Sequence, residues 1–158
     1  MFQIQGCPAR AVALVRFHGD LSEADFVGLI GLAASAGVAW NYIFDFTAVE
    51  RADLAADYVA KLGELPQLFT DRQRICVVPQ ADLRLVRLFA AYQTSKGWRP
   101  PEIVDLLEDA FVRLDVQASD FTPFTGTPPA TLPGGERLPR KICALIWVLG
   151  LRLLHCFS

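Results

Sequence analysis

The sequence contains only two histidines in 158 residues, and only His18 lies in the first 116. Acid–base and nucleophilic catalysis need proton-exchanging side chains within hydrogen-bond reach of one another. The glycine patterns of phosphate-binding loops and of hydrolase nucleophile turns are also absent from the sequence. We therefore predict a protein that is not an enzyme, and we interpret His18 as a surface or turn residue.

Cysteine is scarce as well, and the four cysteines include no closely spaced pair of the kind found in metal and redox sites. Cys76 stands in a dense apolar stretch and is predicted to be a reduced core residue. Cys143 and Cys156, with His155, supply at most three soft ligands, whereas structural zinc normally has about four. We expect neither a metal nor a cofactor.

The chain also lacks the excess of basic residues that nucleic-acid binding requires. Residues 1–116 contain 11 Lys and Arg against 15 Asp and Glu, and residues 117–158 contain 4 against 2. The segment from Met1 to Gln5 has neither the basic start nor the apolar segment of a secretory signal. We expect a cytoplasmic protein that does not bind nucleic acid.

What the first 116 residues do contain is a regular alternation of strand and helix signals in an apolar composition, 53% hydrophobic over the whole chain. Strands are predicted near 1–5, 11–18, 41–46, 74–78 and 102–104, and helices near 22–37, 53–65, 85–97 and 105–114. This alternation predicts an α/β fold with a mixed sheet of about five strands and about four helices, in the order ββαβαβαβα.

Three of the predicted helices begin at side chains that can cap them. Ser22 and Asp25 have the spacing of a capping box at the first helix. Asp53 is predicted to cap the second helix, and Asp105 with Glu108 is predicted to cap the last.

Polar residues gather where the buried strand 41–46 is predicted to end. Ligands and partners usually bind at this edge of open α/β sheets. We therefore predict that a protein partner contacts Asp45, Thr47, Asp53 and Leu54. The alternative is that Asp45 and Thr47 satisfy loop amides while Asp53 caps the next helix.

Trp98 stands beside Arg99 in a predicted loop, and this pairing is typical of interface hot spots. Trp98 is therefore a further partner-binding candidate, although covering the edge of the core is the favoured interpretation. Five arginines lie in this part of the chain, at positions 72, 74, 84, 87 and 99, with Asp71 and Asp82 among them. We interpret this group as a solvated face of mixed charge.

The pattern Asp45-x-Thr47-x-Val49-x-x-x-Asp53 and the predicted element order resemble the STAS-domain group. The resemblance is to the SpoIIAA-like bacterial proteins related to anti-sigma-factor antagonists, and it covers about residues 1–116. The segments 74–78, 85–93 and 102–110 support it. It implies a regulatory signalling module that binds a protein partner or a second copy of itself.

The sequence departs from this group at the predicted helix start. STAS switches of the antagonist type carry Asp-Ser/Thr-Ser-Gly there, whereas this chain has Asp53-Leu54-Ala55-Ala56. The resemblance therefore implies the fold and the docking edge without the phosphorylation switch. Because SpoIIAA-like domains also resemble lipid-binding domains, a small apolar-ligand (lipid) binding domain is the alternative. An apolar cavity on the order of a few hundred Å³ would favour it.

The remaining sequence changes character, with five prolines and three glycines between Phe121 and Pro139. We predict a linker over 117–140 and an apolar tail over 141–158, and we expect residues 1–116 to fold without them. The uncharged run 142–151 spans only about 15 Å as a helix, roughly half of the hydrocarbon core of a membrane. We expect peripheral contact with the inner membrane face, or packing of the tail on the protein's own domain or on a second copy. The candidate residues are Lys141, Leu145, Leu149 and Arg152.

Overall fold

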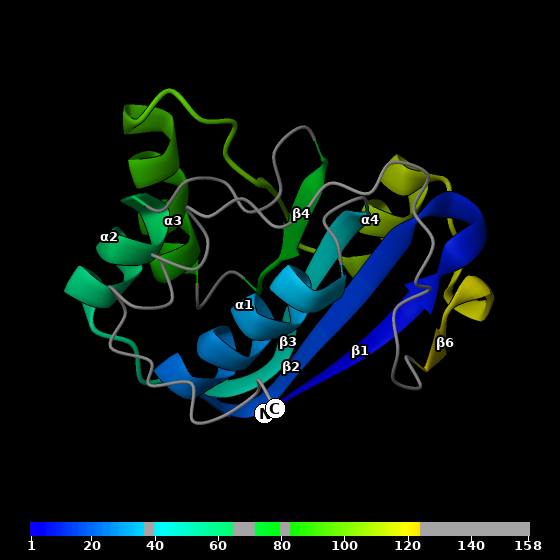
Figure 1. Cartoon of the computed structure of the whole chain (residues 1–158), viewed down its shortest axis with the longest axis horizontal. Helices are drawn as coiled ribbons and strands as arrows, with labels where there is room; N and C mark the ends of the chain where they lie inside the picture. Colours follow the sequence, from blue (N-terminus) through cyan, green and yellow to red (C-terminus); the bar gives the residue numbers. More distant parts are fainter. Residues whose placement is uncertain (37–39, 65–71, 80–82, 124–158) are drawn as a thin grey trace, which may run out of the picture.

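The computed structural model describes residues 1–36, 40–64, 72–79 and 83–123. Six strands form one mixed sheet in the order β5-β4-β3-β2-β1-β6 (Figure 1). They are β1 (Phe2–Cys7), β2 (Val12–Leu21), β3 (Asn41–Ala52), β4 (Arg74–Val77), β5 (Glu102–Val104) and β6 (Thr122–Pro123). β2, β3, β4 and β5 are parallel neighbours, and β1 runs antiparallel to both β2 and β6.

Four helices cover the two faces of this sheet. They are α1 (Glu23–Ala36), α2 (Ala56–Glu64), α3 (Leu83–Ser95) and α4 (Leu107–Leu114), with short 3-10 turns at Pro8–Arg10 and Ala118–Asp120. The α/β fold and the predicted order ββαβαβαβα are confirmed, and β6 adds a sixth strand. The helix ends predicted at Gly37 and Leu65 lie outside the described residues.

Alternate residues of the central strands build two separate cores. Ile43, Ile75 and Val77 point toward α4 and pack with Phe111, whereas Phe44 belongs to the core on the opposite face. Successive side chains of a strand point to opposite faces, so strands that are apolar at every position are buried on both sides. α1 and α3 contribute to the second core, on the face opposite α4.

β3 is six residues longer than the predicted strand 41–46 because it continues alongside β2, which extends to Leu21. β2 advances five residues, from Arg16 to Leu21, while β3 advances seven, from Asp45 to Ala52. The two extra residues of β3 form bulges, which shift the alternation of its side chains. Thr47 therefore lies inside a strand and not in a loop.

Two of the three predicted helix caps are wrong. α2 begins at Ala56, so Asp53 precedes it by three residues and lies on the strand side of the turn. The residue before α4 is Leu106, which makes no side-chain capping bond, so Asp105 does not cap this helix. The cause in the first case is the extension of β3 to Ala52, because Asp53 directly follows this strand and its amide donates to the carbonyl of Leu21 at the end of β2.

Residues beyond 116 take part in the fold. β6 pairs with β1, and the buried ring of Phe121 stacks on Phe111 with ring centroids 5.5 Å apart. Gln117 and Asp120 form a capping box around the 3-10 turn that leads to Phe121. The division of the chain at 116 and 140 stays a prediction, but the described fold continues to Pro123.

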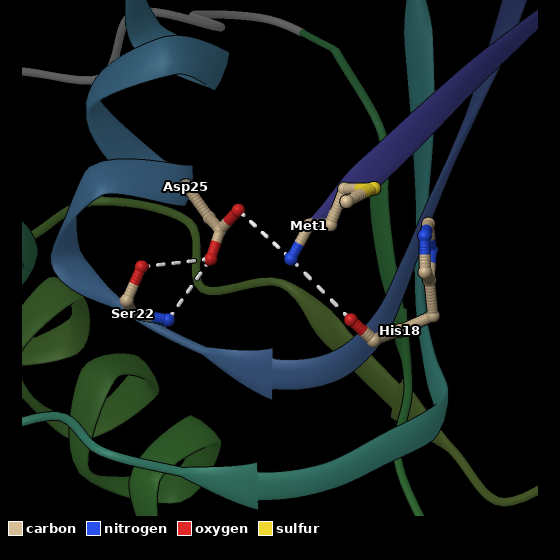
Figure 2. Close-up of polar contacts among 4 residues, drawn as sticks. All are labelled: Met1, His18, Ser22 and Asp25. Carbon is tan, nitrogen blue, oxygen red and sulfur yellow. Dashed lines mark hydrogen bonds and ion pairs between the residues drawn. The ribbon is translucent and has the colours of Figure 1, made fainter.

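The start of β1 is tied to α1 by the side chain of Asp25 (Figure 2). The amino group of Met1 lies 3.0 Å from Asp25 Oδ1 and donates to the carbonyl of His18 at 3.3 Å. Asp25 Oδ2 accepts from the amide of Ser22 at 3.0 Å and from its hydroxyl at 2.9 Å. Half of the predicted capping box is therefore present. Its other half is replaced, because the amide of Asp25 donates to the carbonyl of Ser22 and not to the hydroxyl.

These contacts shift the pKa of Asp25. Burial alone would raise it, but the hydrogen bonds from Ser22 and from the terminal amine, with the positive charge of that amine, lower the pKa below 3.8. A carboxylate whose pKa is lowered by folding stabilises the protein above its unfolded pKa and loses that contribution as the pH falls through its folded pKa.

Asp25→Asn is therefore expected to lower the melting temperature near neutral pH, where the wild-type carboxylate is ionised. The difference from wild type should shrink at an acidic pH below the lowered pKa of Asp25, where its carboxylate becomes protonated. Thermal unfolding followed at both pH values measures it, with Glu23→Gln, an exposed residue of the same turn, as the control. A difference that does not change with pH would contradict the assignment.

Phe121→Ala is expected to lower the free energy of unfolding by about 3 kcal/mol, because it removes a buried ring that packs on Phe111. The matched change Val112→Ala, on the exposed side of α4, should change it by no more than about 0.5 kcal/mol. Denaturant unfolding of the full chain compares the two variants. Equal stabilities would show that residues beyond 116 contribute nothing to the core.

Candidate functional site

A cavity of about 160 Å³ lies on the face of the sheet that α1, α2 and α3 cover. Its lining is almost wholly apolar and comes from these helices, from β2, β3 and β4, and from three connecting segments. The lining residues are Leu21, Phe26, Leu29, Ile30, Phe44, Phe46, Val49, Ala52, Leu54, Val59, Leu62, Arg74, Cys76, Val78, Leu85, Val86, Phe89, Gln93 and Pro101.

The bulges in β3 help to make this lining. Phe46, Val49 and Ala52 all line the cavity, although they are three residues apart and not two. In a regular strand, residues three apart point to opposite faces. Each bulge adds one residue to β3, so that the apolar side chain after the bulge again points toward the cavity.

The other wall depends on the close contact of α2 with α3. A Cβ atom on Gly63 of α2 would lie 2.5 Å from Cβ of Tyr92 on α3. Only glycine permits this approach, since real Cβ contacts are not that short. The α2–α3 pair therefore presents Val59, Leu62 and Phe89 to the cavity as one surface.

One part of the lining is polar, and it is built by Arg74 and Gln93. Their relative exposures are 7% and 2%. Arg74 Nη1 donates to Gln93 Oε1 at 3.1 Å, and Gln93 Nε2 donates to the carbonyl of Gly63 at 3.2 Å. Arg74 Nη2 donates to the carbonyl of Arg99. The interpretation of Arg74 as part of a solvated face is wrong, because the first position of β4 points into the protein.

Arg74 is a buried charge whose hydrogen-bond partners are neutral. Among the described residues, none of the ion pairs includes it. Burial lowers the pKa of Arg74 because desolvation disfavours the charged form, and the nearby charge of Arg99 lowers it further, against an opposing effect of Cys76. A guanidinium stays protonated in proteins even so.

Cys76 lies next to this polar part, buried and free, as its apolar setting predicts. Burial raises the pKa of its thiol to about 12, against a smaller opposing effect of Arg74. The thiol is therefore protonated at neutral pH, and a protonated thiol is a poor nucleophile.

Of the predicted partner-binding residues, the structure brings Asp45 and Thr47 into direct contact. Asp45 Oδ1 accepts from the amide of Thr47 at 3.0 Å and from its hydroxyl at 2.6 Å. Asp45 Oδ2 lies 3.5 Å from Nε of Arg16, an ion-pair distance, although that nitrogen has no hydrogen-bond partner. Asp45 is buried and satisfies the first bulge of β3, so only Thr47 is exposed.

Asp53 and Leu54 lie elsewhere. Asp53 is exposed, and its amide donates to the carbonyl of Leu21 at the end of the β2–β3 pair. It is thus about five residues of β2 beyond the partner of Asp45, roughly 16 Å along the strand. Leu54 is half-buried and lines the cavity.

Trp98 is associated with the polar part of the cavity through its backbone. α3 ends at Ser95, Gly97 takes a left-handed conformation at φ +73°, and the amide of Trp98 then donates to the carbonyl of Gln93 at 3.0 Å. Its half-buried side chain precedes Arg99, whose carbonyl binds Arg74. Of the predicted residues, Leu54 lines the cavity, whereas Trp98 is connected to the lining residue Gln93 only through its backbone amide.

Sequence reasoning missed Arg74 and Gln93 as site residues. One signal was available: Gln93 follows Val86 by seven residues and Phe89 by four, which places it on the apolar side of α3. Arg74 begins a strand in which every residue is buried. A polar residue on an apolar stripe is a candidate for a buried polar contact.

The tail candidates Lys141, Leu145, Leu149 and Arg152 lie outside the described residues. Within the described ranges, no helix has both the length and the apolar character needed to cross a membrane. In the same part of the chain, no three metal-binding side chains come together.

Comparison with known proteins gives structural similarity alone. No protein-family model and no curated protein matches the sequence. The unphosphorylated form of the anti-sigma factor antagonist SpoIIAA aligns with a TM-score of 0.48 at 19% identity, covering 72% of this chain and 96% of that one. An anti-sigma factor antagonist from Mycobacterium paratuberculosis aligns with a TM-score of 0.48 at 17% identity, covering 73% and 93%. The implied similarity to SpoIIAA-like structures is thus found at low sequence identity.

Proposed function

We propose that this chain is a non-enzymatic binding module that holds a small apolar molecule between its sheet and helices α1, α2 and α3. The cavity of about 160 Å³ with its apolar lining is the observation that carries the proposal. A cavity of about 150 Å³ lined by Leu, Ile and Phe stays dry and binds benzene. The volume of the cavity indicates a ligand with one ring or a short alkyl chain, because pockets for drug-sized ligands are larger, about 300–1,000 Å³.

The chemistry of the lining supports binding without catalysis. A general acid or base must exchange a proton near the working pH. The described lining contains no carboxylate and no imidazole, and its thiol and guanidinium both stay protonated at neutral pH. A molecule held there would make apolar contacts and accept hydrogen bonds. The groups that supply these contacts do not exchange a proton with it.

Toluene is expected to raise the melting temperature of the full chain by several degrees, because a ligand that binds only the native state stabilises it. The gain is about 1.4 kcal/mol at ten times the dissociation constant. Ala52→Leu places three extra carbon atoms in the lining and should abolish this rise. The matched change Ala48→Leu, at an exposed position of the same strand outside the lining, should leave the rise intact. No rise in the wild type, or equal rises in both variants, would refute binding in the cavity.

A second candidate function, binding of a protein partner or of a second copy, has its own observation. β4 pairs with β3 only from Tyr42 to Asp45, whereas β3 continues to Ala52. In the described ranges no strand pairs with the β4 side of this extension. An unpaired strand edge accepts an extended segment of another chain. Two of the predicted partner residues support this candidate, because Thr47 is exposed within the extension and Asp53 is exposed directly after it; Glu50 is a further exposed residue of the extension.

Glu50→Lys combined with Asp53→Lys is expected to abolish partner binding at the β3 extension. The free energy of unfolding should change by no more than about 0.5 kcal/mol, since both side chains are exposed. Glu108→Lys with Asp109→Lys makes the same charge change on exposed positions of α4 and serves as the control. Affinity purification of the tagged full chain from its own cells, with mass spectrometry, makes the comparison. Retention of the same partners by both double variants would place the docking surface elsewhere.

A further inference from the structure

The single charged side chain in the cavity lining indicates which apolar molecules the cavity takes. Arg74 is 7% exposed, and the rest of the lining is apolar except for Gln93 and the thiol of Cys76. A buried charge is costly unless it is paired as well as hydrogen-bonded. The hydrogen bonds of Arg74 to Gln93 and to the carbonyl of Arg99 solvate its guanidinium without neutralising it.

Gln93 holds the guanidinium in one orientation. Its Nε2 donates to the carbonyl of Gly63, so its Oε1 is the atom that faces Arg74 Nη1 at 3.1 Å. Gln93 is itself 2% exposed and joins α3 to α2 through this bond. The guanidinium has five N–H groups, and two bonds to neutral acceptors leave donors for a ligand. A donor group held in place before the ligand arrives loses little freedom on binding.

We propose that the cavity binds a small apolar carboxylate, whose negative charge pairs with Arg74 and whose body packs against side chains such as Phe44, Val78 and Phe89. This inference rests on the proposed binding function and adds the class of ligand. A carboxylate matches the planar guanidinium and can accept two parallel hydrogen bonds from it. Its single charge also matches the one cation of the lining, whereas a phosphate brings up to about two charges. The volume of about 160 Å³ suits a body the size of benzoate or hexanoate.

Isothermal titration of the full chain with benzoate and with benzyl alcohol, a neutral molecule of similar shape, tests this selectivity without any variant. Benzoate should bind about tenfold or more tightly than benzyl alcohol, since hydrogen bonds to charged groups contribute more than neutral ones. If neither molecule binds and toluene does not bind, the proposed function itself is wrong. If benzyl alcohol binds as tightly as benzoate, the cavity takes ligands but the inference about charge is wrong.

The variant Arg74→Met then tests whether Arg74 is the cation that binds the carboxylate. The variant keeps an unbranched side chain without the charge, so benzoate affinity should fall about tenfold or more while benzyl alcohol affinity stays within about twofold. Arg87→Met, at an exposed position of α3 outside the lining, is the matched control and should leave both affinities unchanged. Equal loss of benzoate binding in both variants, or no loss in Arg74→Met, would overturn the assignment. If Arg74→Met fails to fold, the comparison of benzoate with benzyl alcohol on the unaltered chain still decides it.

Discussion

The pairing of β2 with β3 is the constraint on which the rest of this structure depends. These two strands are the longest in the sheet, and β3 separates the two cores of the protein. Their bulges let β3 turn apolar side chains toward the cavity at Phe46, Val49 and Ala52. The same bulges require Asp45, whose carboxylate satisfies the amide and hydroxyl of Thr47. A residue that the sequence places at a docking edge is thus used to hold the backbone in position.

The second organising feature is a buried polar chain in an otherwise apolar region. Arg74, Gln93 and the carbonyl of Gly63 connect β4, α3 and α2 by hydrogen bonds. Gly63 has two roles. Its lack of a side chain lets α2 approach Tyr92, and its carbonyl accepts a hydrogen bond from the side chain of Gln93. Apolar side chains would fill this space with a smaller desolvation penalty, since burying a charge requires compensating hydrogen bonds. A positive charge beside an apolar cavity has a physical use when the cavity receives an anion, and this links the stability of the α2–α3 pair to the proposed ligand.

Much of the fold could be predicted from local pattern, and the failures have a common cause. Dense apolar runs such as 74–78 identify central strands because such strands must bury both faces. The spacing of Phe26, Leu29 and Ile30 identifies the first helix in the same way. The second helix start was misplaced at Asp53 because an acidic residue before an apolar period is also compatible with the segment that follows a longer strand. What decided between the two was the pairing of the extended β3 with β2 as far as Leu21, and the spacing of residues 53–65 contains no information about β2.

The sequence by itself determined the alternation of strands and helices and the two-sided burial of the central strands. These properties follow from periodicity and composition, which are local. Only the tertiary structure decided that Arg74 points inward and donates a hydrogen bond to Gln93 and not to a carboxylate. It alone also decided that Phe121 packs on Phe111. It also decided that a cavity remains between the sheet and three helices. Contacts between residues far apart in the chain depend on how elements meet, and the pattern within any one element does not specify how closely its neighbours approach.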